Sequence, residues 1–236
     1  DIAGSRSHVR MLESVGLIDK EELDAIMAAL LQVENEIAEG TIRWAANDED
    51  IHTAVERRAT ELAPASAKMH TGRSRNDQVA NDVRLFVKSE VDDLVSLAFE
   101  LIAVIRLRAE EAHAEGIYLP GYTHMQQAQP VSLAHHLAAY CWMLLRDVDR
   151  MKDAKRRADV SVLGAGALAG SSLPLNPAFT AADLGFDQLF ENSLDAVSDR
   201  DFVADVLYAL TTLGLHLSKL GEELVIWASS EFAFIT

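Results

Sequence analysis

The chain has 236 residues, 49% of them apolar and 25% charged, so it is long enough to bury one large core or two smaller ones. Acidic residues outnumber basic ones by 37 to 21, which gives a net charge of −16. A chain this acidic is repelled by nucleic acid and by anionic membranes, so we exclude both as expected partners. The single cysteine, Cys141, cannot form an internal disulfide, and a reducing cytoplasm is the expected compartment.

Targeting signals are also not expected. No uncharged apolar run reaches the roughly 18 residues that a membrane-spanning helix needs. The first residues do not have the composition of a signal peptide. Because the sequence begins with Asp1 rather than Met, we expect further chain upstream.

Helical periodicity runs through the first part of the chain. A short helix is expected over residues 7–15, ending at Gly16. The sequence Asp-Lys-Glu-Glu at residues 19–22 predicts a capping box in front of a second helix, which ends at Gly40. The acidic residues 47–50 predict the start of a third helix, and Pro64 ends it.

Three long periodic segments follow. The first repeats apolar residues from Val87 to Ile105, and the second runs from Ser132 to about Arg157. The third has an unbroken alternation of three- and four-residue steps: Val203, Val206, Leu210, Leu213, Leu217, Leu220, Leu224 and Trp227. The sequence Ser-Asp-Arg-Asp at residues 198–201 predicts a capping box for it.

These segments predict an all-α protein, because no segment has the alternation of a β-strand. A helix over residues 199–231 would be about 50 Å long. A small monomeric domain cannot cover such a helix on all sides. We therefore expect an elongated helix bundle that other subunits complete.

Residues 71–78, Thr-Gly-Arg-Ser-Arg-Asn-Asp-Gln, form the first polar segment between the predicted helices. Arg, Ser and Asn are the donor types that bind a carboxylate or a phosphate. The alternative is a solvated loop in which Ser74 or Asn76 caps the next helix, and composition alone favours this alternative.

Residues 121–130, Gly-Tyr-Thr-His-Met-Gln-Gln-Ala-Gln-Pro, form the second polar segment. His124 is the natural proton donor near neutral pH. Taken alone, a single loop histidine is more often a surface residue. His135 and His136, in the predicted helix that follows, are expected to pack or to face solvent. The side chains that could converge on a polar ligand are Thr123, His124, Gln126, Gln127 and Gln129.

Two other segments suggest ligand sites that we do not predict. The glycine-rich residues 163–174 fit neither the dinucleotide fingerprint nor the phosphate-binding loop, so they indicate a tight passage between helices. His52 follows the acidic residues 47–50, a combination that can bind a metal ion. Acidic residues at a helix start are the simpler explanation, and we predict no metal.

Taken together, the motifs resemble a known family. Residues 71–78 and 121–130 are similar to the first and second signature regions of argininosuccinate lyase, which belongs to the fumarase/aspartase superfamily together with the δ-crystallins. Supporting matches occur at residues 47–56, 164–170 and 192–201. Fumarases carry a Ser-Ser-Asn-Asp type of first region and adenylosuccinate lyases a Thr-His-Gly-Gln type of second region, and the chain matches neither.

The resemblance implies a lyase that cleaves argininosuccinate to arginine and fumarate, the last step of arginine biosynthesis, without a cofactor. Such a β-elimination needs a base, an acid and groups that stabilise a developing dianion. By similarity, His124 is the general acid or its partner, and Thr123 binds a substrate carboxylate beside it. The fumarate-forming end would be held by Ser74, Arg75, Asn76 and Gln126.

The resemblance also implies a homotetramer with a twenty-helix core and active sites shared among three subunits. The family's third signature, Gly-Ser-Ser-x-Met-Pro-x-Lys-x-Asn, carries the serine taken as the base and does not occur in this sequence. We therefore expect a partial chain that is inactive alone. Residues 1–73 would belong to an N-terminal helical domain and residues 74–236 to a truncated central bundle, with the C-terminal domain absent.

Two alternatives to this function stay open at this stage. One is a superfamily lyase that releases fumarate from another substrate. The other is a non-catalytic relative of the crystallin type, or a helical scaffold that keeps the fold.

Overall fold

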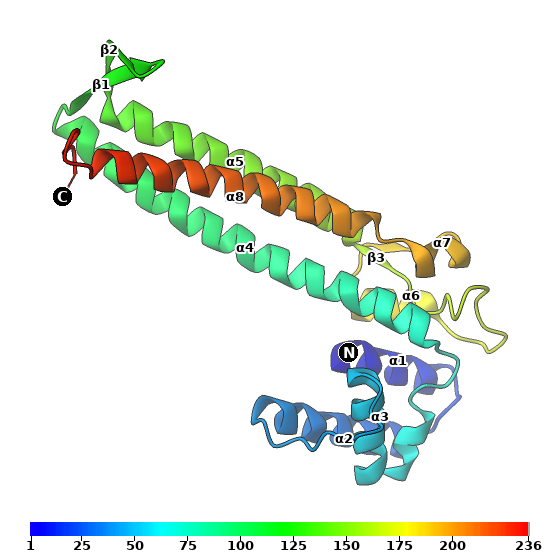
Figure 1. Ribbon diagram of the computed structural model, residues 1–236. Helices are drawn as coiled ribbons and strands as arrows, with labels where there is room; N and C mark the ends of the chain where they lie inside the picture. Colours follow the sequence, from blue (N-terminus) through cyan, green and yellow to red (C-terminus); the bar gives the residue numbers. More distant parts are fainter. Residues whose placement is uncertain (236) are drawn as a thin grey trace. The chain divides into compact units, whose positions relative to one another are not determined.

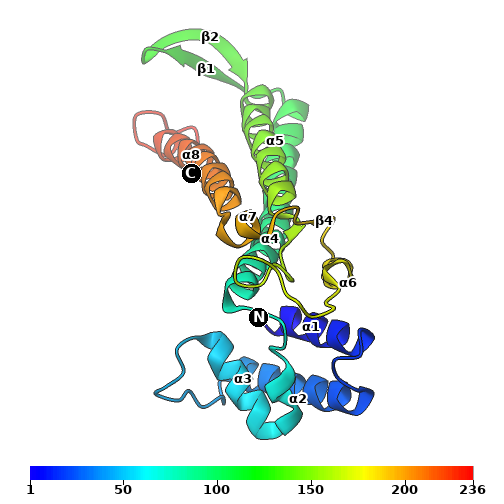
Figure 2. The ribbon, with the colours of Figure 1, turned by 90° about the vertical axis from the view of Figure 1, so that its right-hand side faces the viewer.

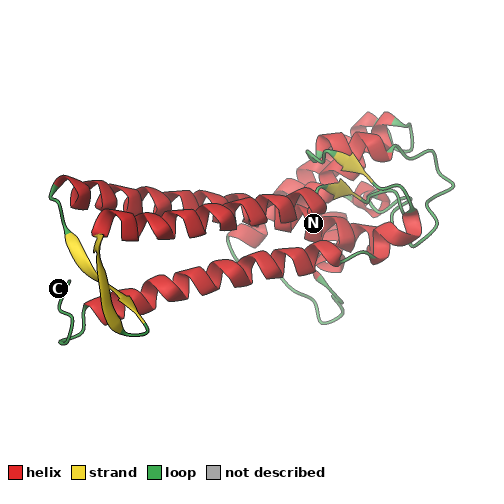
Figure 3. Ribbon diagram, turned by 90° about the horizontal axis from the view of Figure 1, so that it is seen from above, coloured by secondary structure: helices red, strands yellow, loops and turns green. Residues whose placement is uncertain are grey.

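The computed structural model describes residues 1–235, and most of them are helical (Figure 1). The strands are confined to two small two-stranded sheets (Figure 3). The elements in chain order are α1 (Ile2–Ser14), α2 (Lys20–Ala38), α3 (Ile51–Leu62), the 3₁₀ helix η1 (Pro64–Lys68), α4 (Arg75–Ala114), β1 (Tyr118–Thr123), β2 (Gln126–Ser132), α5 (Leu133–Ala158), β3 (Val160–Ser161), α6 (Pro177–Asp183), β4 (Gln188–Leu189), α7 (Ser193–Ser198) and α8 (Asp201–Trp227).

The chain divides into two compact units. The first unit contains residues 1–86 and 159–199, and the second contains residues 87–158 and 200–236. Helix α4 begins in the first unit and continues into the second. The domain boundary predicted between residues 73 and 74 stays a prediction.

In the first unit, α1, α2, α3 and η1 pack around one hydrophobic core (Figure 2). The predicted capping box begins α2: Asp19 accepts a hydrogen bond from the backbone of Glu22, and the Glu22 side chain accepts one from the backbone of Asp19. Asp50 caps α3 by accepting from the backbone of Thr53, as the acidic residues 47–50 predicted. The core residues include Val9, Leu12, Ile26, Leu30, Val33 and Val55.

The rest of the first unit packs on the beginning of α4. Strands β3 and β4 form a short parallel pair between Val160 and Gln188 and between Ser161 and Leu189. A second small core lies here, and it consists of Ala80, Val162, Ala165 and Ala196.

In the second unit, α5 and α8 run side by side (Figure 1), and α4 shares a core with them. Two polar pairs also join α5 to α8: His136 Nε2 lies 2.7 Å from Glu223 Oε2, and His216 Nδ1 lies 2.6 Å from Asp147 Oδ2. The shared apolar core is centred on Ile105, Tyr140 and Leu144, with Leu213 and Leu220 packed against it.

The predicted apolar seam of α8 is only partly an interface within this chain. Leu217 and Leu224 are 42% and 41% exposed. The polar residues His216 and Glu223, one position earlier, contact α5 in their place. The residues that face α5 thus keep the alternation of three- and four-residue steps, but His216 and Glu223 take the places predicted for Leu217 and Leu224. Leu217 and Leu224 lie instead on an exposed apolar stripe of α8.

The capping box predicted before α8 is wrong. The residue before α8 is Arg200, and it makes no side-chain capping bond to the helix. Ser198 Oγ instead donates to the carbonyls of Leu194 and Asp195 in α7. The hydroxyl therefore serves the end of one helix rather than the start of the next.

Residues 121–130, expected as a loop, lie in an antiparallel β-hairpin. Strands β1 and β2 pair Tyr118 with Ser132 and Thr123 with Gln126. A Cβ on Gly121 would lie 2.6 Å from the carbonyl oxygen of Gln129, so only glycine fits this crossing. The prediction missed the hairpin because its turn has no Asn-Gly or Asp-Gly signal.

None of the helices in residues 1–235 is both long and apolar enough to cross a membrane.

Candidate active site

The first polar segment forms the approach to α4 and its first turn. Asp77 is fully buried, and its carboxylate accepts from the backbone N–H groups of Ser74, Gly164 and Gly166 at 2.9, 3.1 and 2.9 Å. Burial raises the pKa of Asp77, although the three N–H donors favour its charged form. Asp77 thereby fixes the start of α4 to the glycine-rich segment.

Ser74 and Asn76 lie at the accessible edge of this turn. Ser74 Oγ accepts from the backbone N–H of Asn76 at 3.2 Å, and Asn76 Nδ2 donates to the carbonyl of Ala167 at 3.1 Å. Ser74 therefore does cap the helix, which was the alternative to a ligand site. The cap uses Oγ as an acceptor, whereas an anion would use the hydroxyl as a donor, so the two roles are compatible.

Arg75 is held by acidic and amide partners. Its Nη1 donates to Glu56 Oε1 at 3.1 Å and to Gln78 Oε1, and its Nε lies 3.4 Å from Asp50 Oδ2. Burial alone would raise the pKa of Glu56, but the His70 imidazole and the Arg75 guanidinium hold it below its ordinary value. These contacts therefore hold the Arg75 guanidinium in one orientation.

Arg73, the other guanidinium of the segment, is buried. Its Nη1 donates to Ser5 Oγ at 3.1 Å, and its Nη2 lies 3.9 Å from Glu56 Oε1. Burial lowers the pKa of Arg73 to about 10, and Glu56 and two aspartates oppose this shift. Arg73 therefore stays charged at neutral pH, as a buried cation inside the first unit.

His52 contacts two aspartates that are distant in sequence. Its Nδ1 lies 3.1 Å from Asp1 Oδ1 and 3.7 Å from Asp82 Oδ2, and within residues 1–235 these three form the one group with metal-binding spacing. Arg73 acts electrostatically on Asp82, and Arg75 acts on His52. Two guanidiniums beside the group disfavour a divalent cation.

The second polar segment belongs to the second unit, where it is exposed. Thr123 and Gln126 pair at the ends of the two strands, and His124 and Met125 form the turn between them. Both turn residues have positive φ, 52° and 60°. This conformation costs residues with a Cβ about 1–2 kcal/mol each. Strain of this kind concentrates at functional sites, which favours a role for His124 beyond that of a surface residue.

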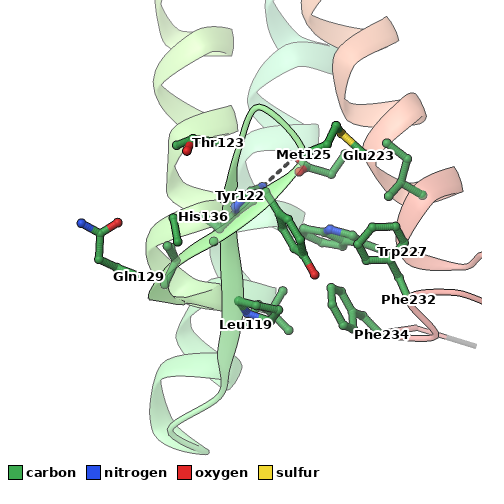
Figure 4. A pocket seen from close by; sticks show the side chains of 15 residues that line it. Leu119, Tyr122, Thr123, Met125, Gln129, His136, Glu223, Trp227, Phe232 and Phe234 are labelled. Carbon is green, nitrogen blue, oxygen red and sulfur yellow. Dashed lines mark hydrogen bonds and ion pairs between the residues drawn. The ribbon is translucent and has the colours of Figure 1, made fainter.

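A cavity of about 390 Å³ lies beside the hairpin (Figure 4). Aromatic rings form much of its wall: Tyr122 meets Phe232 edge to face at 5.6 Å between centroids, and the His136 ring lies 5.1 Å from Trp227. His136, expected to pack or face solvent, packs here and pairs with Glu223. The polar side chains that line the cavity are Thr123, Gln129, His136 and Glu223.

Tyr140 completes the polar group behind this cavity by donating its hydroxyl to Glu223. Burial, and then the neighbouring carboxylate, raise the pKa of Tyr140 above its ordinary value. The hydroxyl therefore stays protonated and fixes Glu223 in place. Sequence reasoning missed Glu223 because nothing in the heptad pattern marks it as inward-facing.

The predicted site residues thus fall into two sets. Ser74, Arg75 and Asn76 lie together in the first unit, and Thr123, His124 and Gln126 lie together in the second. Neither unit holds both sets. The sequence did not single out Glu56 or Asp77, although the segment 47–56 that matched the family ends at Glu56.

Comparison with known proteins connects these two sets to a family. A family described as "Lyase" matches residues 1–236. The chain belongs to this lyase family. Argininosuccinate lyases from Frankia casuarinae, Symbiobacterium thermophilum and Thermus thermophilus are 48%, 50% and 49% identical to it, over 236, 236 and 237 residues. These matches confirm the resemblance to argininosuccinate lyase that the motifs predicted. They cover all of this chain and 50–51% of each relative, so the chain spans about half the length of these lyases.

Solved structures confirm the all-α fold of this lyase chain. EDDS lyase in complex with formate has a TM-score of 0.85 at 29% identity, over 98% of this chain and 45% of that one. A fumarate lyase/δ-crystallin from Brucella melitensis bound to cobalt has a TM-score of 0.81 at 18% identity, over 98% of this chain and 55% of that one. At 18% identity the second likeness concerns the fold alone.

Proposed function

We propose that the full-length protein cleaves argininosuccinate to arginine and fumarate by β-elimination, as a cytoplasmic enzyme of arginine biosynthesis. The observation that carries this proposal is the near-50% identity of the whole chain to argininosuccinate lyases. The two polar segments, 71–78 and 121–130, supply the donor types that the reaction needs.

The reaction removes a proton from a carbon of the succinate group and breaks the neighbouring C–N bond. The C–H electrons form the new double bond, and the departing guanidine nitrogen takes up a proton. His124 is the proposed proton donor, because a protonated leaving group departs more easily. Thr123, next to it, binds a substrate carboxylate through its hydroxyl.

The fumarate-forming end of the substrate is an anion that gains charge in the transition state. In this proposal Ser74 donates an O–H and Asn76 an N–H to that anion, while Arg75 adds positive charge nearby. Gln126 reaches the same anion from the hairpin. No cofactor is required, because the substrate carboxylate accepts the developing charge.

The proposed assembly is a homotetramer in which the two sets of residues meet from different subunits. Neither unit of one chain holds both sets, and the second unit exposes many large apolar side chains. Exposed apolar patches of this extent mark protein contacts. They include Leu97, Val104 and Leu107 of α4, Trp142 of α5, and Leu207, Tyr208, Leu215, Leu217 and Val225 of α8.

The test is the release of fumarate by the full-length protein, followed by ultraviolet absorbance, with argininosuccinate, adenylosuccinate and EDDS supplied separately. Rapid release from argininosuccinate alone supports the proposal. Release from one of the others instead indicates a different lyase of the superfamily. A folded protein that releases fumarate from none of them indicates a non-catalytic relative.

A further inference from the structure

Glu56 of α3 lies outside both polar segments, yet one of its carboxylate oxygens lies close to Arg73 and Arg75 of the first segment and to His70, the residue just before it. Oε1 lies 2.9 Å from His70 Nδ1, 3.1 Å from Arg75 Nη1 and 3.9 Å from Arg73 Nη2. These three residues come from a stretch of six, immediately before and at the start of α4. One carboxylate on a neighbouring helix thus lies close to both guanidiniums of the segment.

Two further residues at the start of α3, Asp50 and Thr53, also contact Arg75. Thr53 Oγ1 lies 3.5 Å from its Nη2, and Asp50 Oδ2 lies 3.4 Å from its Nε. Asp50 caps α3, and Thr53 and Glu56 lie in its first two turns, so all three residues are at the start of the helix. The Arg75 guanidinium therefore contacts three residues at the start of α3, namely Asp50, Thr53 and Glu56. Asn76, the next residue after Arg75, is exposed.

Glu56 also balances a charge that cannot reach water. The side chain of Arg73 is fully buried, and an unpaired buried cation is costly. The carboxylate is held in its charged form by its neighbours, so it can serve Arg73 and Arg75 together. Its removal would take one carboxylate partner from each of the two guanidiniums.

On the basis of the proposed function, we propose that Glu56 is a positioning residue for carboxylate recognition by Ser74 and Asn76. It does not touch the substrate. It fixes Arg75 against α3, and the backbone that carries Ser74 and Asn76 is fixed with it. Donors held in place before binding lose less entropy when the anion arrives, so their placement contributes to substrate affinity and to turnover.

The test compares Glu56→Gln with Glu61→Gln in the full-length enzyme. Glu61 is a matched control on the same helix, since it also binds two arginines, Arg57 and Arg58, at 2.8 and 3.1 Å but does not contact the first segment. We expect KM for argininosuccinate to rise at least about tenfold in Glu56→Gln, and less than twofold in Glu61→Gln, in tetramers of wild-type size. Equal KM changes in the two variants would overturn the proposal.

A second variant separates positioning from a general loss of structure. In an Arg75→Gln background, where the held guanidinium is gone, Glu56→Gln should raise KM by no more than about twofold further. Fully independent, multiplicative effects of the two changes would contradict action through Arg75. If Glu56→Gln does not assemble, Glu56→Asp takes its place: its shorter carboxylate should still raise KM, and an unchanged KM would overturn the proposal.

Succinate binding, measured by calorimetry, keeps this test separate from the proposed function. If the wild type releases no fumarate from argininosuccinate, the proposed function fails, and succinate affinity alone then decides the role of Glu56. Weaker succinate binding in Glu56→Gln but not in Glu61→Gln supports the role. Equal binding in both variants, or no binding even by the wild type, overturns it.

Discussion

The two polar segments of this chain are built in opposite ways. Residues 71–78 are tied down, with Asp77 accepting three backbone N–H bonds and Arg75 held by acidic partners. Residues 121–130 form an exposed hairpin whose turn residues, His124 and Met125, both have positive φ. The difference fits the two proposed roles, in which the first segment binds the anion with side chains held in place and the second donates a proton from an accessible turn.

The two units also differ in the burial of their apolar side chains. The helices of the first unit bury residues such as Leu12, Ile26 and Leu30 completely. In the second unit Trp142 is 65% exposed and Tyr208 is 64% exposed. The first unit therefore has a completely buried core of its own, although Trp44, Phe86 and Leu194 are exposed there. The second unit exposes large apolar side chains along its long helices, and these are the proposed contacts with other subunits.

The largest expected effect concerns those faces. Changing Leu217 and Leu224 together to Asp should dissociate the proposed tetramer of the full-length protein, because each charge that becomes buried and unpaired at an interface costs several kcal/mol. Ala28→Asp with Asn35→Asp is the matched control, since both residues are exposed positions of α2 in the first unit, also seven apart. Sedimentation velocity measures the outcome. An intact tetramer in the leucine variant would show that the stripe is not an interface.

The next effect concerns the side chains of the first segment that are proposed to donate hydrogen bonds to the substrate anion. Asn76→Ala should weaken the binding of argininosuccinate by about 1.5–3 kcal/mol, the usual scale for a hydrogen bond to a charged group. The melting temperature should change little, because the side chain is exposed. Steady-state kinetics and thermal unfolding measure both quantities, with Asn35→Ala, an exposed asparagine of α2, as the control. Unchanged kinetics would favour a purely structural role for this turn.

A pH experiment tests the buried histidine of the first unit, His8. Burial, and then Arg73, lower the pKa of His8 from 6.5 to about 3, and its Nε2 lies 2.9 Å from the carbonyl oxygen of Thr71. Because the unfolded state takes up the proton first, the contribution of His8 is complete above about pH 6.5 and is lost as the pH falls toward 3. Between pH 7.5 and 5 this loss amounts to about 2 kcal/mol.

Urea unfolding at the two pH values tests this linkage. His8→Gln can still donate to Thr71 and should lose about 2 kcal/mol less than the wild type on acidification. Asn35→Gln, an exposed change that adds no titratable group, should follow the wild type. If His8→Gln loses as much stability as the wild type, His8 is not the buried neutral histidine described above.

The smallest effect concerns the strained turn of the second segment. Met125→Gly should stabilise the hairpin by about 1 kcal/mol, because glycine adopts positive φ without a Cβ penalty. Ala128→Gly, in strand β2, should have the opposite sign, since glycine weakens a regular strand. Slower hydrogen exchange of the amides of Thr123 and Gln126 would report the gain. Faster exchange in Met125→Gly would mean that the turn carries no strain.

Much of the helical fold was predictable because its signals are local. The capping box at Asp19 was found from side-chain types at fixed spacing, and the start of α3 from the acidic residues 47–50. The hairpin was not found, since Pro120, Gly121 and Pro130 interrupt the regular polar–apolar alternation of a strand and its turn lacks the usual sequence. The phase of α8 was missed for another reason: His216 and Glu223 face inward only because α5 offers Asp147 and His136 as partners.

The candidate site was predictable only in part. The two segments were recognised from their residue types and from the family resemblance. Their partners were not, because Glu56 and Asp77 act through contacts with chain segments up to 89 residues away. Such contacts depend on tertiary packing, which no local pattern encodes.

The most direct test of this account is the turnover of His124→Asn in the full-length protein. General acid catalysis contributes about 10²–10⁴-fold, so fumarate release from argininosuccinate should fall by that factor. Succinate affinity and the tetramer should be unchanged, because His124 is exposed at the turn and is not assigned to anion binding. Turnover close to the wild type in a folded His124→Asn tetramer would contradict the account and remove the hairpin tip from the chemistry.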